Sequence, residues 1–348
     1  MNKNILRICS LIMVVSLILL SFTACKKDTG YEQNNESTTA ETETTEVAPL
    51  GEGINPLTGE KTLTKEAIGK RPVAIMIENS PAARPQWGLS TPDVVVEGIV
   101  EGGITRMMWI YADTATMPSV IGPVRSARHD YVEIADGMNA LYIHCGGSNI
   151  ADEYMPQIGM DHVNLMVSST GSQREPSRKA PHNLIINKDA FVNSIKSTKK
   201  LEQTKDNFAP FTFDGEVKGD KACNSVKVSF SSSYKHTFKY DEKENVYYNY
   251  MNTSEMKDGN NNKTMAVSNV IVMYSPVKQC DEKGHMDWEM SGGKALLVTN
   301  GTVQEITYKK ADKRAPLKFY GVDGKLLKVN AGKTWIGVVP TGHDAEIA

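Results

Sequence analysis

The sequence predicts a mixed α/β (α+β) fold with an N-terminal α/β half and a C-terminal β-rich half. The chain has 348 residues, a length typical of two domains. Apolar residues make up 40% and charged residues 23%, which indicates a globular protein. Strand and helix patterns alternate up to about residue 200, and strand patterns alone follow. We therefore expect an α/β domain over 54–204 and a β-rich domain over 205–348, packed on the first.

The first 24 residues have the pattern of a signal peptide. Lys3 and Arg7 precede a run without charge, 8–24, and Cys25 follows directly. The sequence Phe-Thr-Ala-Cys ending at Cys25 resembles the lipobox of bacterial lipoproteins, whose cysteine is acylated before cleavage. An ordinary secretory signal, cut nearby, is the alternative. We expect a lipoprotein whose acylated Cys25 anchors it in the lipid bilayer, on the extracytoplasmic face of the bacterial cell membrane.

Residues 25–53 have the composition of a disordered, acidic, Thr-rich tether. Seven acids and six threonines lie between residues 26 and 53. So few apolar side chains cannot bury enough surface to offset the entropy of ordering the segment.

In the N-terminal half, Val73–Ile77 predicts a buried strand. Residues 93–101 are ambiguous, because Thr91 and a following proline could begin a helix, whereas the β-branched residues favour a strand. We favour a hairpin that turns at Gly102-Gly103 and returns over 104–111. The elements expected next are a helix capped by Ser126 that runs to about Met138, a strand over 141–145, a helix over 149–158, strands over 162–167 and 183–186, and a helix over 188–199 capped by Asn187.

In the C-terminal half, residues 226–230 and the segment through 247–250 alternate as strands do. Asn300-Gly301 is the strongest two-residue hairpin signal in the chain, and Asp323-Gly324 repeats it. The Asn- and Lys-rich stretch 251–264 predicts a loose loop.

Several motifs in this order resemble those of the YerB-like family of bacterial lipoproteins. They are Asn-Pro-Leu-Thr-Gly at 55–59, Glu-Gly-Gly-Ile-Thr-Arg at 101–106, Ile-Gly-Pro-Val-Arg-Ser-Ala-Arg at 121–128, His-Cys-Gly-Gly-Ser at 144–148, Ser-Arg-Lys-Ala-Pro-His-Asn at 177–183 and Lys-Thr-Trp-Ile-Gly at 333–337. The resemblance covers almost everything after residue 54 and departs late, over Asn252–Thr264. It implies a layered sheet–sheet–helix sandwich of unknown biochemical function, and it supplies no catalytic residues.

Charge and cysteine content exclude several classes of protein. The formal net charge is −2, which argues against nucleic-acid binding through overall basic charge. The chain has no Cys-x-x-Cys pair, and its histidines lack the short spacings of zinc sites, so we expect no metal and no cofactor. Cys223 with Cys280 is the one disulfide worth considering.

Arginine is distributed unevenly along the chain. Seven of the nine arginines lie between residues 71 and 178. A guanidinium group offers planar paired donors that suit carboxylate and phosphate, so an anion site in the N-terminal half would produce this bias. Ion pairing with neighbouring acids is the alternative.

A glycine turn before a helix suggests where an anion could bind. Gly146, Gly147 and Ser148 follow a strand and begin a helix, whose N-terminus presents backbone N–H groups. The alternative is a tight turn with Gly147 at positive φ. The polar loop 172–182 could close over the same turn, or could be an ordinary solvated loop. The candidate ligand-binding residues are Arg125, Arg128, His129, His144, Gly146, Gly147, Ser148, Arg174, Arg178, Lys179 and His182.

Catalytic interpretations rest on weaker patterns. His129 or His144 with Asp130 or Ser148 could serve a hydrolase or transferase, but no Gly-x-Ser-x-Gly elbow surrounds the serine. We interpret Glu97 and Glu101 as a salt-bridge ladder rather than as a catalytic pair of carboxylates. In a hairpin with Ile99 opposite Arg106, both acids flank that arginine.

The sequence thus favours binding over catalysis. The leading hypothesis is an extracytoplasmic lipoprotein that binds an anionic small molecule, a wall polymer or another cell-envelope component through an Arg-rich cleft. The alternatives are an envelope hydrolase or transferase, and a scaffold that docks another envelope protein through the β-rich half.

Overall fold

The computed structural model describes residues 53–168, 170–198, 200–202, 209–213 and 215–348. The predicted signal peptide, Cys25 and the predicted tether up to residue 52 lie outside the described residues. Within the described ranges, no helix combines the length and the apolar character that a membrane span requires.

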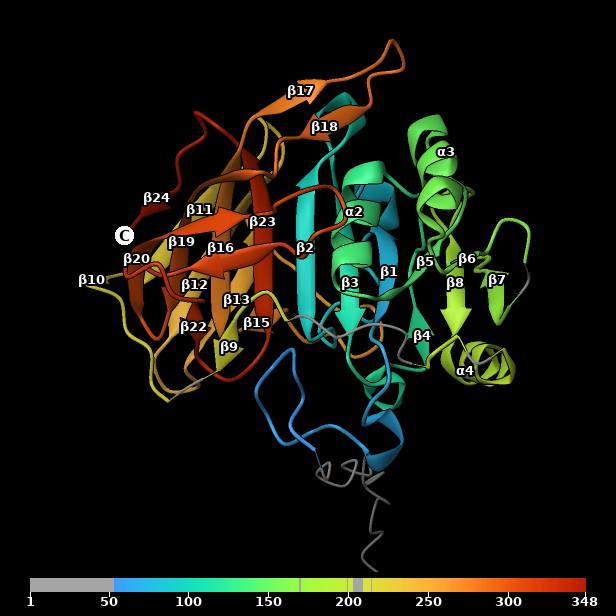
Figure 1. Ribbon diagram of the computed structural model, residues 1–348, viewed down its shortest axis with the longest axis horizontal. Coiled ribbons are helices and arrows are strands. Elements are labelled where there is room, and N and C mark those ends of the chain that lie inside the picture. The colour runs from blue at the N-terminus through green and yellow to red at the C-terminus, as the bar shows by residue number, and fades with distance from the viewer. Residues whose placement is uncertain (1–52, 169, 199, 203–208, 214) are drawn as a thin grey trace, which may run out of the picture. The chain divides into compact units, whose positions relative to one another are not determined.

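One large mixed sheet of 11 strands forms the centre of the described fold (Figure 1). In spatial order its strands are β10 (Lys221–Ala222), β20 (Thr302–Lys309), β19 (Gly292–Thr299), β16 (Asn269–Ser275), β23 (Thr334–Pro340), β2 (Val94–Ile99), β3 (Thr105–Tyr111), β1 (Val73–Glu78), β5 (Leu141–His144) and β6 (His162–Asn164), and β21 (Lys318–Tyr320) pairs with β20.

The sequence forms this sheet because its central strands are continuous apolar runs. Every residue of β1, β2 and β3 is buried, as expected of strands covered on both faces. The two halves of the chain share the sheet, because β23 lies between β2 and β16 and pairs with both in parallel.

Helices cover one face of this sheet and a second sheet covers the other, which confirms the expected layered sandwich. α2 (His129–Gly137) and α3 (Asn149–Ile158) lie on the first face, and Tyr131 and Met155 pack there against alternate residues of β1, β2 and β3. On the other face, α4 (Lys188–Ser197) and the second sheet contribute to a core around Trp109 and Trp335. The second sheet contains β14 (Ser254–Glu255), β13 (Val246–Met251), β12 (Lys235–Asp241), β11 (Ser225–Ser229), β24 (Glu346–Ile347) and β15 (Ala266–Val267).

Smaller elements complete the described fold. The short pairings join β17 (Val277–Gln279) to β18 (Met286–Trp288), β22 (Lys328–Val329) to β9 (Thr212–Phe213), and β8 (Leu184–Asn187) to both β4 (Val120–Ile121) and β7 (Ser172–Arg174). The 3₁₀ turns are η1 (Lys65–Ala67), η2 (Pro81–Ala83), η3 (Glu101–Gly103) and η4 (Thr114–Thr116).

The hairpin over β2 and β3 is confirmed, but its predicted register is wrong by one residue. Gly98, rather than Ile99, lies opposite Arg106. The cause is the connection, which is a three-residue 3₁₀ turn in which Gly102 and Gly103 have φ of 69° and 71°. A two-residue Gly-Gly turn would have kept the predicted register. The expected ladder of Glu97 and Glu101 around Arg106 is therefore not formed.

Local helix signals are mostly confirmed. α3 begins and ends as predicted, and the side chains of Ser148 and Asn187 cap α3 and α4. α2 begins two residues later than predicted, because its N-cap is Arg128 rather than Ser126 and the chain at that cap is extended. Asn300 and Gly301 form the predicted tight turn, with φ of 50° and 67°.

The stretch 251–264 is not the loose loop that its composition predicts. It contains β14, and Asp258 is 1% exposed. The Asp258 carboxylate accepts hydrogen bonds from the backbone N–H groups of Gly88 and Ser90, both at 2.9 Å. Hydrogen bonds from the loop that contains Gly88 and Ser90 therefore hold this polar segment in place. The three cysteines of the described part, Cys145, Cys223 and Cys280, are free thiols, so the considered disulfide is absent.

Candidate functional site

The segment 122–128 extends the sheet between the carboxyl ends of β1 and β5. Those strands pair in parallel only as far as Ile75 and Ile143. Beyond that point, Arg125 N donates to the carbonyl of Met76 at 2.9 Å, and Cys145 N donates to the carbonyl of Arg125 at 3.0 Å. This insertion positions Arg125 and the residues after it at the carboxyl edge, where open α/β sheets usually bind ligands.

Glu78, the last residue of β1, faces Arg125 at this edge. Its Oε1 accepts hydrogen bonds from Ser80 Oγ at 2.8 Å and from His182 Nδ1 at 2.7 Å. Its Oε2 lies 3.6 Å from Arg125 Nε, too far for a hydrogen bond. Both of these atoms are buried and have no hydrogen-bond partner in the described part of the chain. The ion pair is therefore loose, and it leaves one buried donor and one buried acceptor unsatisfied.

Two more arginines complete a basic group. Arg106 of β3 is 4% exposed and donates to the carbonyl of Ser126 at 2.9 Å. Arg128 donates to the Glu101 carboxylate and to the carbonyl of Ala127, while its Nε is buried and makes no hydrogen bond to a described residue. Burial, followed by the charge of Arg128, lowers the pKa of Arg106 to about 9, and Arg125 adds to this effect. We name Arg106, Arg125 and Arg128, with Glu78 and Glu101, the arginine site.

The glycine turn beside this site differs from its prediction. Gly146 has positive φ, at 70°, and Gly147 does not. A Cβ at Gly147 would lie 2.0 Å from the Asp152 carboxylate, so a larger residue there would require the Asp152 side chain to move. The N–H of Gly146 donates to Asn164 Oδ1, and that of Ser148 donates to the carbonyl of Ala127. Two of the backbone donors proposed for an anion are thus used within the fold.

His144 forms a pair with His162 and does not contact Ser148. Its Nδ1 lies 2.7 Å from the carbonyl oxygen of Gly146, so that nitrogen carries the proton. Its Nε2 then accepts a hydrogen bond from His162 Nδ1 at 2.8 Å. Burial lowers the pKa of His144 to about 4, against the carbonyl contact, which raises it, and the neighbouring His162 lowers it further. The Ser148 hydroxyl accepts from Ala151 N as the helix cap.

The loop that begins at β7 sends its basic residues to different places. His182 reaches Glu78, as described above, and Arg174 donates to Asn183 Oδ1 at 2.9 Å. Arg178 stacks on Trp87, 3.8 Å from the ring centroid, and donates to the carbonyl oxygens of Ala83 and Pro85. Lys179 is exposed. His182 and Arg125 thus lie against the same carboxylate, that of Glu78, while Arg178 packs against the loop after β1.

His129 and Asp130 begin α2 and are both buried. Their closest polar atoms, His129 Nε2 and Asp130 Oδ1, are 3.5 Å apart. The same Nε2 lies 3.1 Å from Asp287 Oδ1, which the β17–β18 hairpin supplies from the other half of the chain. Burial lowers the pKa of His129, against the hydrogen bond with the Asp287 carboxylate, which raises it.

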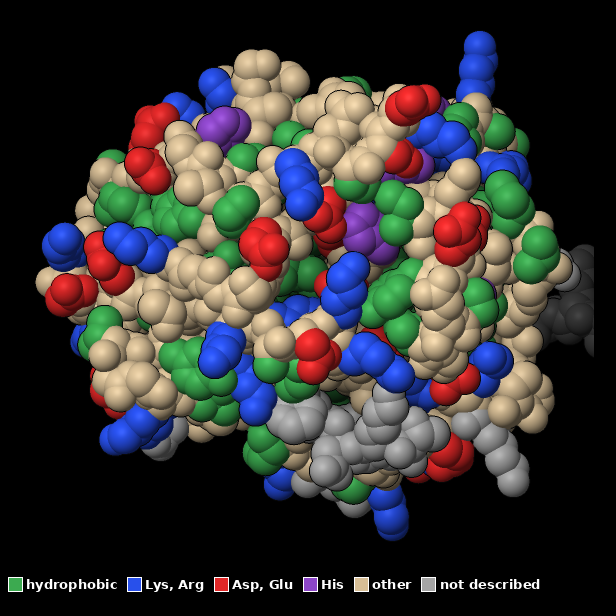
Figure 2. Space-filling model, turned by 45° about the horizontal axis from the view of Figure 1, so that its top comes forward, with side chains coloured by type: hydrophobic (Ala, Val, Ile, Leu, Met, Phe, Trp, Pro, Cys, Tyr) green, Lys and Arg blue, Asp and Glu red, His purple; other side chains and the backbone are tan. Residues whose placement is uncertain are grey.

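The surface seen from this end of the sheet has no large area of one charge. Figure 2 shows Lys and Arg, Asp and Glu, and His side chains interspersed over that face. The hairpin β17–β18 and the start of α3 lie at the same end of the sheet (Figure 1). On this face, basic side chains therefore form no continuous patch.

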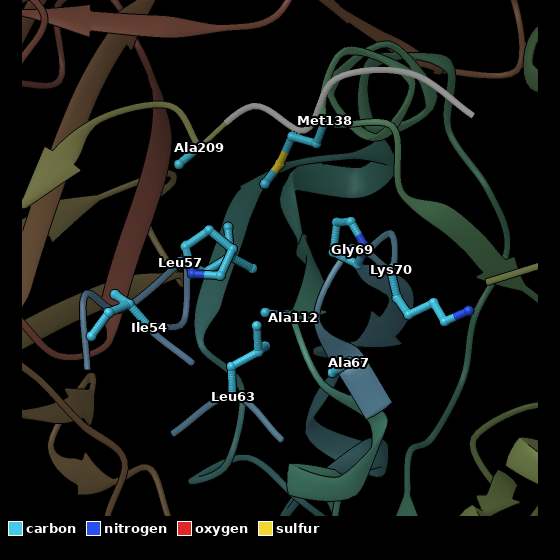
Figure 3. Close-up of a pocket in the computed structure, with 11 residues that line it drawn as sticks. Ile54, Leu57, Leu63, Ala67, Gly69, Lys70, Ala112, Met138 and Ala209 are labelled. Carbon is cyan, nitrogen blue, oxygen red and sulfur yellow. The ribbon is translucent and has the colours of Figure 1, made fainter. Parts of the chain in front are cut away.

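An apolar cavity of about 150 Å³ lies near the amino end of β1 (Figure 3). Leu57, Leu63, Ala112 and Met138 contribute to its lining, and the Lys70 ammonium points away from it. Its lining offers no converging charged donors, so anion chemistry belongs to the other edge of the sheet.

Sequence reasoning missed several residues that the fold brings to these clusters. Glu78 carried a usable signal, because an acid at the end of a buried strand lies at the carboxyl edge. Asp287 and His236 carried no such signal, because each meets a partner that is far away in the sequence. Asp287 and His129 are 158 residues apart, and His236 and Glu97 are 139 residues apart.

Comparison with known proteins places the chain in one family. Residues 57–202 match the N-terminal domain, and residues 226–336 the C-terminal domain, of the family described as "Protein of unknown function (DUF3048)". A protein of Bacillus subtilis (strain 168) named "Putative lipoprotein YerB" is 32% identical over 300 residues, which cover 84% of this chain and 88% of that protein. The crystal structure of the YerB protein from Bacillus subtilis matches with a TM-score of 0.74 at 30% identity, covering 84% of this chain and 98% of that chain. The chain therefore belongs to the DUF3048 family, to which its YerB-like motifs and layered fold both point.

Proposed function

We propose that this protein is a membrane-tethered, extracytoplasmic lipoprotein that binds an anionic small molecule or cell-envelope component at the arginine site. The observation that carries the proposal is the pair of buried guanidinium Nε donors, on Arg125 and Arg128, without acceptors among the described residues. Leaving a buried donor unsatisfied costs about 1–3 kcal/mol, and more when it is charged. Oxygen atoms of a bound anion would remove that cost.

The composition of the site indicates the class of ligand. Three guanidinium groups face two carboxylates, those of Glu78 and Glu101, which leaves a net positive charge. Guanidinium groups bind carboxylate and phosphate oxygens through paired hydrogen bonds. We therefore infer a ligand with a carboxylate or phosphate group.

The contacts favour binding over the catalytic alternative. Both ring nitrogens of His144 have partners other than Ser148, and the Ser148 hydroxyl accepts from a backbone N–H. A nucleophile needs its base within hydrogen-bond reach. Docking of another envelope protein, the third candidate, rests on no specific contact in the described part of the chain.

Titration calorimetry with inorganic phosphate, pyrophosphate and citrate tests anion binding. Arg125→Ala should weaken the Kd of whichever anion binds by about tenfold or more, because one charge-assisted hydrogen bond contributes about 1.5–3 kcal/mol. Arg314→Ala is the matched control, since Arg314 pairs with Asp136, on another part of the molecule, and is half-exposed. An unchanged Kd in Arg125→Ala, or no binding of any of these anions by the wild type, would contradict the proposal. Water would then be the partner of these donors.

The tether is tested separately. Cys25→Ala should move the protein from the membrane fraction to the medium, or leave an uncleaved precursor, and should abolish incorporation of labelled fatty acid. A variant that fractionates and labels like the wild type would contradict a lipid anchor at this residue.

A further inference from the structure

The β17–β18 hairpin, from the C-terminal half, is fixed against the start of α2. Trp288 N donates to Asp130 Oδ1 at 2.8 Å, and the Trp288 indole donates to the carbonyl of Ile99 at 3.1 Å. The indole also meets the Tyr131 ring edge-on, with centroids 4.8 Å apart. These contacts hold Asp287, the residue before Trp288, beside the first turn of the helix.

Asp287 completes a group of potential metal ligands with His129 and Asp130. The three ligand atoms, His129 Nε2 and one carboxylate oxygen from each aspartate, all lie within 4.8 Å of one another. The Nε2 is 3.1 Å from Asp287 Oδ1 and 3.5 Å from Asp130 Oδ1. Bonds of about 2.0–2.1 Å around a tetrahedral ion put neighbouring ligand atoms about 3.3 Å apart. The spacing to Asp287 and Asp130 therefore suits two edges of such a tetrahedron.

The charges of this group are not balanced within the described residues. Asp130 is 2% exposed, and the ion pairs of the described chain bring it no lysine or arginine within 4.0 Å. Lys278 lies 3.4 Å from the other oxygen of Asp287. Two carboxylates therefore lie close to one imidazole in a largely buried place, and a bound cation would offset the repulsion between the carboxylates.

His129 is able to act as a ligand. The residue is 4% exposed, and a neutral imidazole has a lone pair on one ring nitrogen. Its Nδ1 is buried and makes no hydrogen bond to a described residue, so Nδ1 can carry the proton and leave Nε2 bare. Without an ion, Nε2 can instead carry the proton and donate it to Asp287 Oδ1 at 3.1 Å, and a cation bound among the three atoms would replace that hydrogen bond.

We propose that His129, Asp130 and Asp287 bind a divalent metal ion of the Zn²⁺ type. One nitrogen and two carboxylate oxygens match zinc, whereas Ca²⁺ and Mg²⁺ prefer oxygen ligands alone. The fourth position would be filled by water or by Glu133, which lies one turn after His129 on α2 and now pairs with Lys313 at 3.5 Å. Histidine spacing along the chain predicts no such site, because Asp287 joins His129 from a distance of 158 residues.

The ion would connect the two halves of the chain. It would join a helix of the α/β half to a hairpin of the β-rich half, beside the contact of His285 with Glu101 at 3.3 Å. This inference is independent of anion binding at the arginine site, since none of the three ligands belongs to that site.

Titration calorimetry of the metal-depleted full chain with ZnCl₂ tests the site. The wild type should bind one equivalent, and Asp287→Asn and His129→Gln should each weaken the Kd by about tenfold or more. Asp287→Asn keeps the shape of a partly exposed side chain, so it reports on the metal rather than on folding. Asp281→Asn is the matched control, because Asp281 contacts His285 on the same hairpin, and its Kd should stay within about twofold of the wild type.

A Co²⁺ titration supplies a second readout. The wild type should develop visible absorption bands of tetrahedral Co²⁺, and Asp287→Asn should not. The inference is overturned if the wild type binds no stoichiometric Zn²⁺, if it binds Ca²⁺ or Mg²⁺ as tightly, or if Asp287→Asn binds Zn²⁺ unchanged while its circular dichroism is native.

Discussion

Glu97 and Glu78 are both buried glutamates on the strands that flank β3, yet their surroundings differ. Glu97 is fully buried, and its Oε1 accepts from Asn79, Thr105 and His236 while its Oε2 accepts from the Trp335 indole. Glu78 is 3% exposed, but its Oε2 makes no hydrogen bond among the described residues. The Glu97 carboxylate, saturated with hydrogen bonds, joins several parts of the structure. The Glu78 carboxylate is unsaturated, because its Oε2 can still accept a hydrogen bond from a bound molecule.

The difference has a physical explanation in what each carboxylate faces. Glu97 lies in the core between the two sheets, where His236 and Trp335 come from the β-rich half. Burial alone would raise the pKa of Glu97, but His236 and the hydrogen bonds from Thr105 and Trp335 outweigh it, so the pKa is lowered. Glu78 lies at the carboxyl edge of the sheet, where the strands end and its neighbours Arg125 and His182 are partly exposed.

The largest expected effect comes from breaking the saturated cluster. Glu97→Ala should lower the free energy of unfolding by about 3–5 kcal/mol, because it leaves His236, Thr105, Asn79 and the Trp335 indole without their acceptor. Urea denaturation of wild type and variant measures the difference. Glu97→Gln, which keeps an acceptor oxygen, should cost less. A loss below about 1 kcal/mol in the alanine variant would show that this cluster does not hold the sheets together.

A second test uses His144, whose surroundings disfavour its charged form. The surroundings of Glu97 have the opposite effect and favour its charged form. The pKa of His144 is lowered to about 4, so between that pH and about 6.5 the unfolded chain binds a proton that the folded chain does not. The free energy of unfolding should therefore fall, by up to about 3 kcal/mol, as the pH drops through this range. Denaturation at several pH values should show a shallower decline in His144→Gln than in the wild type. Parallel curves would refute this assignment.

The smallest expected effect on stability comes from the unsaturated cluster. Glu78→Gln should change the free energy of unfolding by less than about 1 kcal/mol, because Oε2 makes no hydrogen bond to lose. The same change removes a negative charge beside Arg125, so the Kd of a bound anion such as phosphate should fall by roughly threefold or more. Glu305→Gln, on an exposed position of β20, is the control for both measurements. A large loss of stability in Glu78→Gln would show that Glu78 stabilises the fold, as Glu97 is expected to do.

Elements whose signals lie within a few residues could be predicted from the sequence. The cap of α4 by Asn187 and the turn at Asn300-Gly301 depend on neighbouring residues alone, and both are confirmed. The register of β2 with β3 could not be predicted, because two glycines fit a two-residue or a three-residue connection equally well.

The candidate sites were predictable only in part. The concentration of arginine in the N-terminal half and the glycine turn after β5 point to one edge of the sheet. The acids that face those arginines follow from tertiary packing, as Glu78 beside Arg125 and Glu101 beside Arg128 show. Composition also failed for Asp258, since a polar residue that caps a distant loop looks the same in the sequence as one in solvent.

The position of β23 has a consequence for the order in which the chain can fold. Among the described strands of the large sheet, β23 comes last along the chain, yet it lies between β2 and β16. Before it is in place, each of those strands has one long edge without a partner, and an open edge of this kind invites pairing with other chains. Pairing Val94 with Thr334 also closes a loop of about 240 residues, and such non-local contacts form slowly. A nascent or truncated chain that lacks β23 would thus hold two incomplete sheets, and synthesis of this one strand sets the earliest moment at which the sandwich can close.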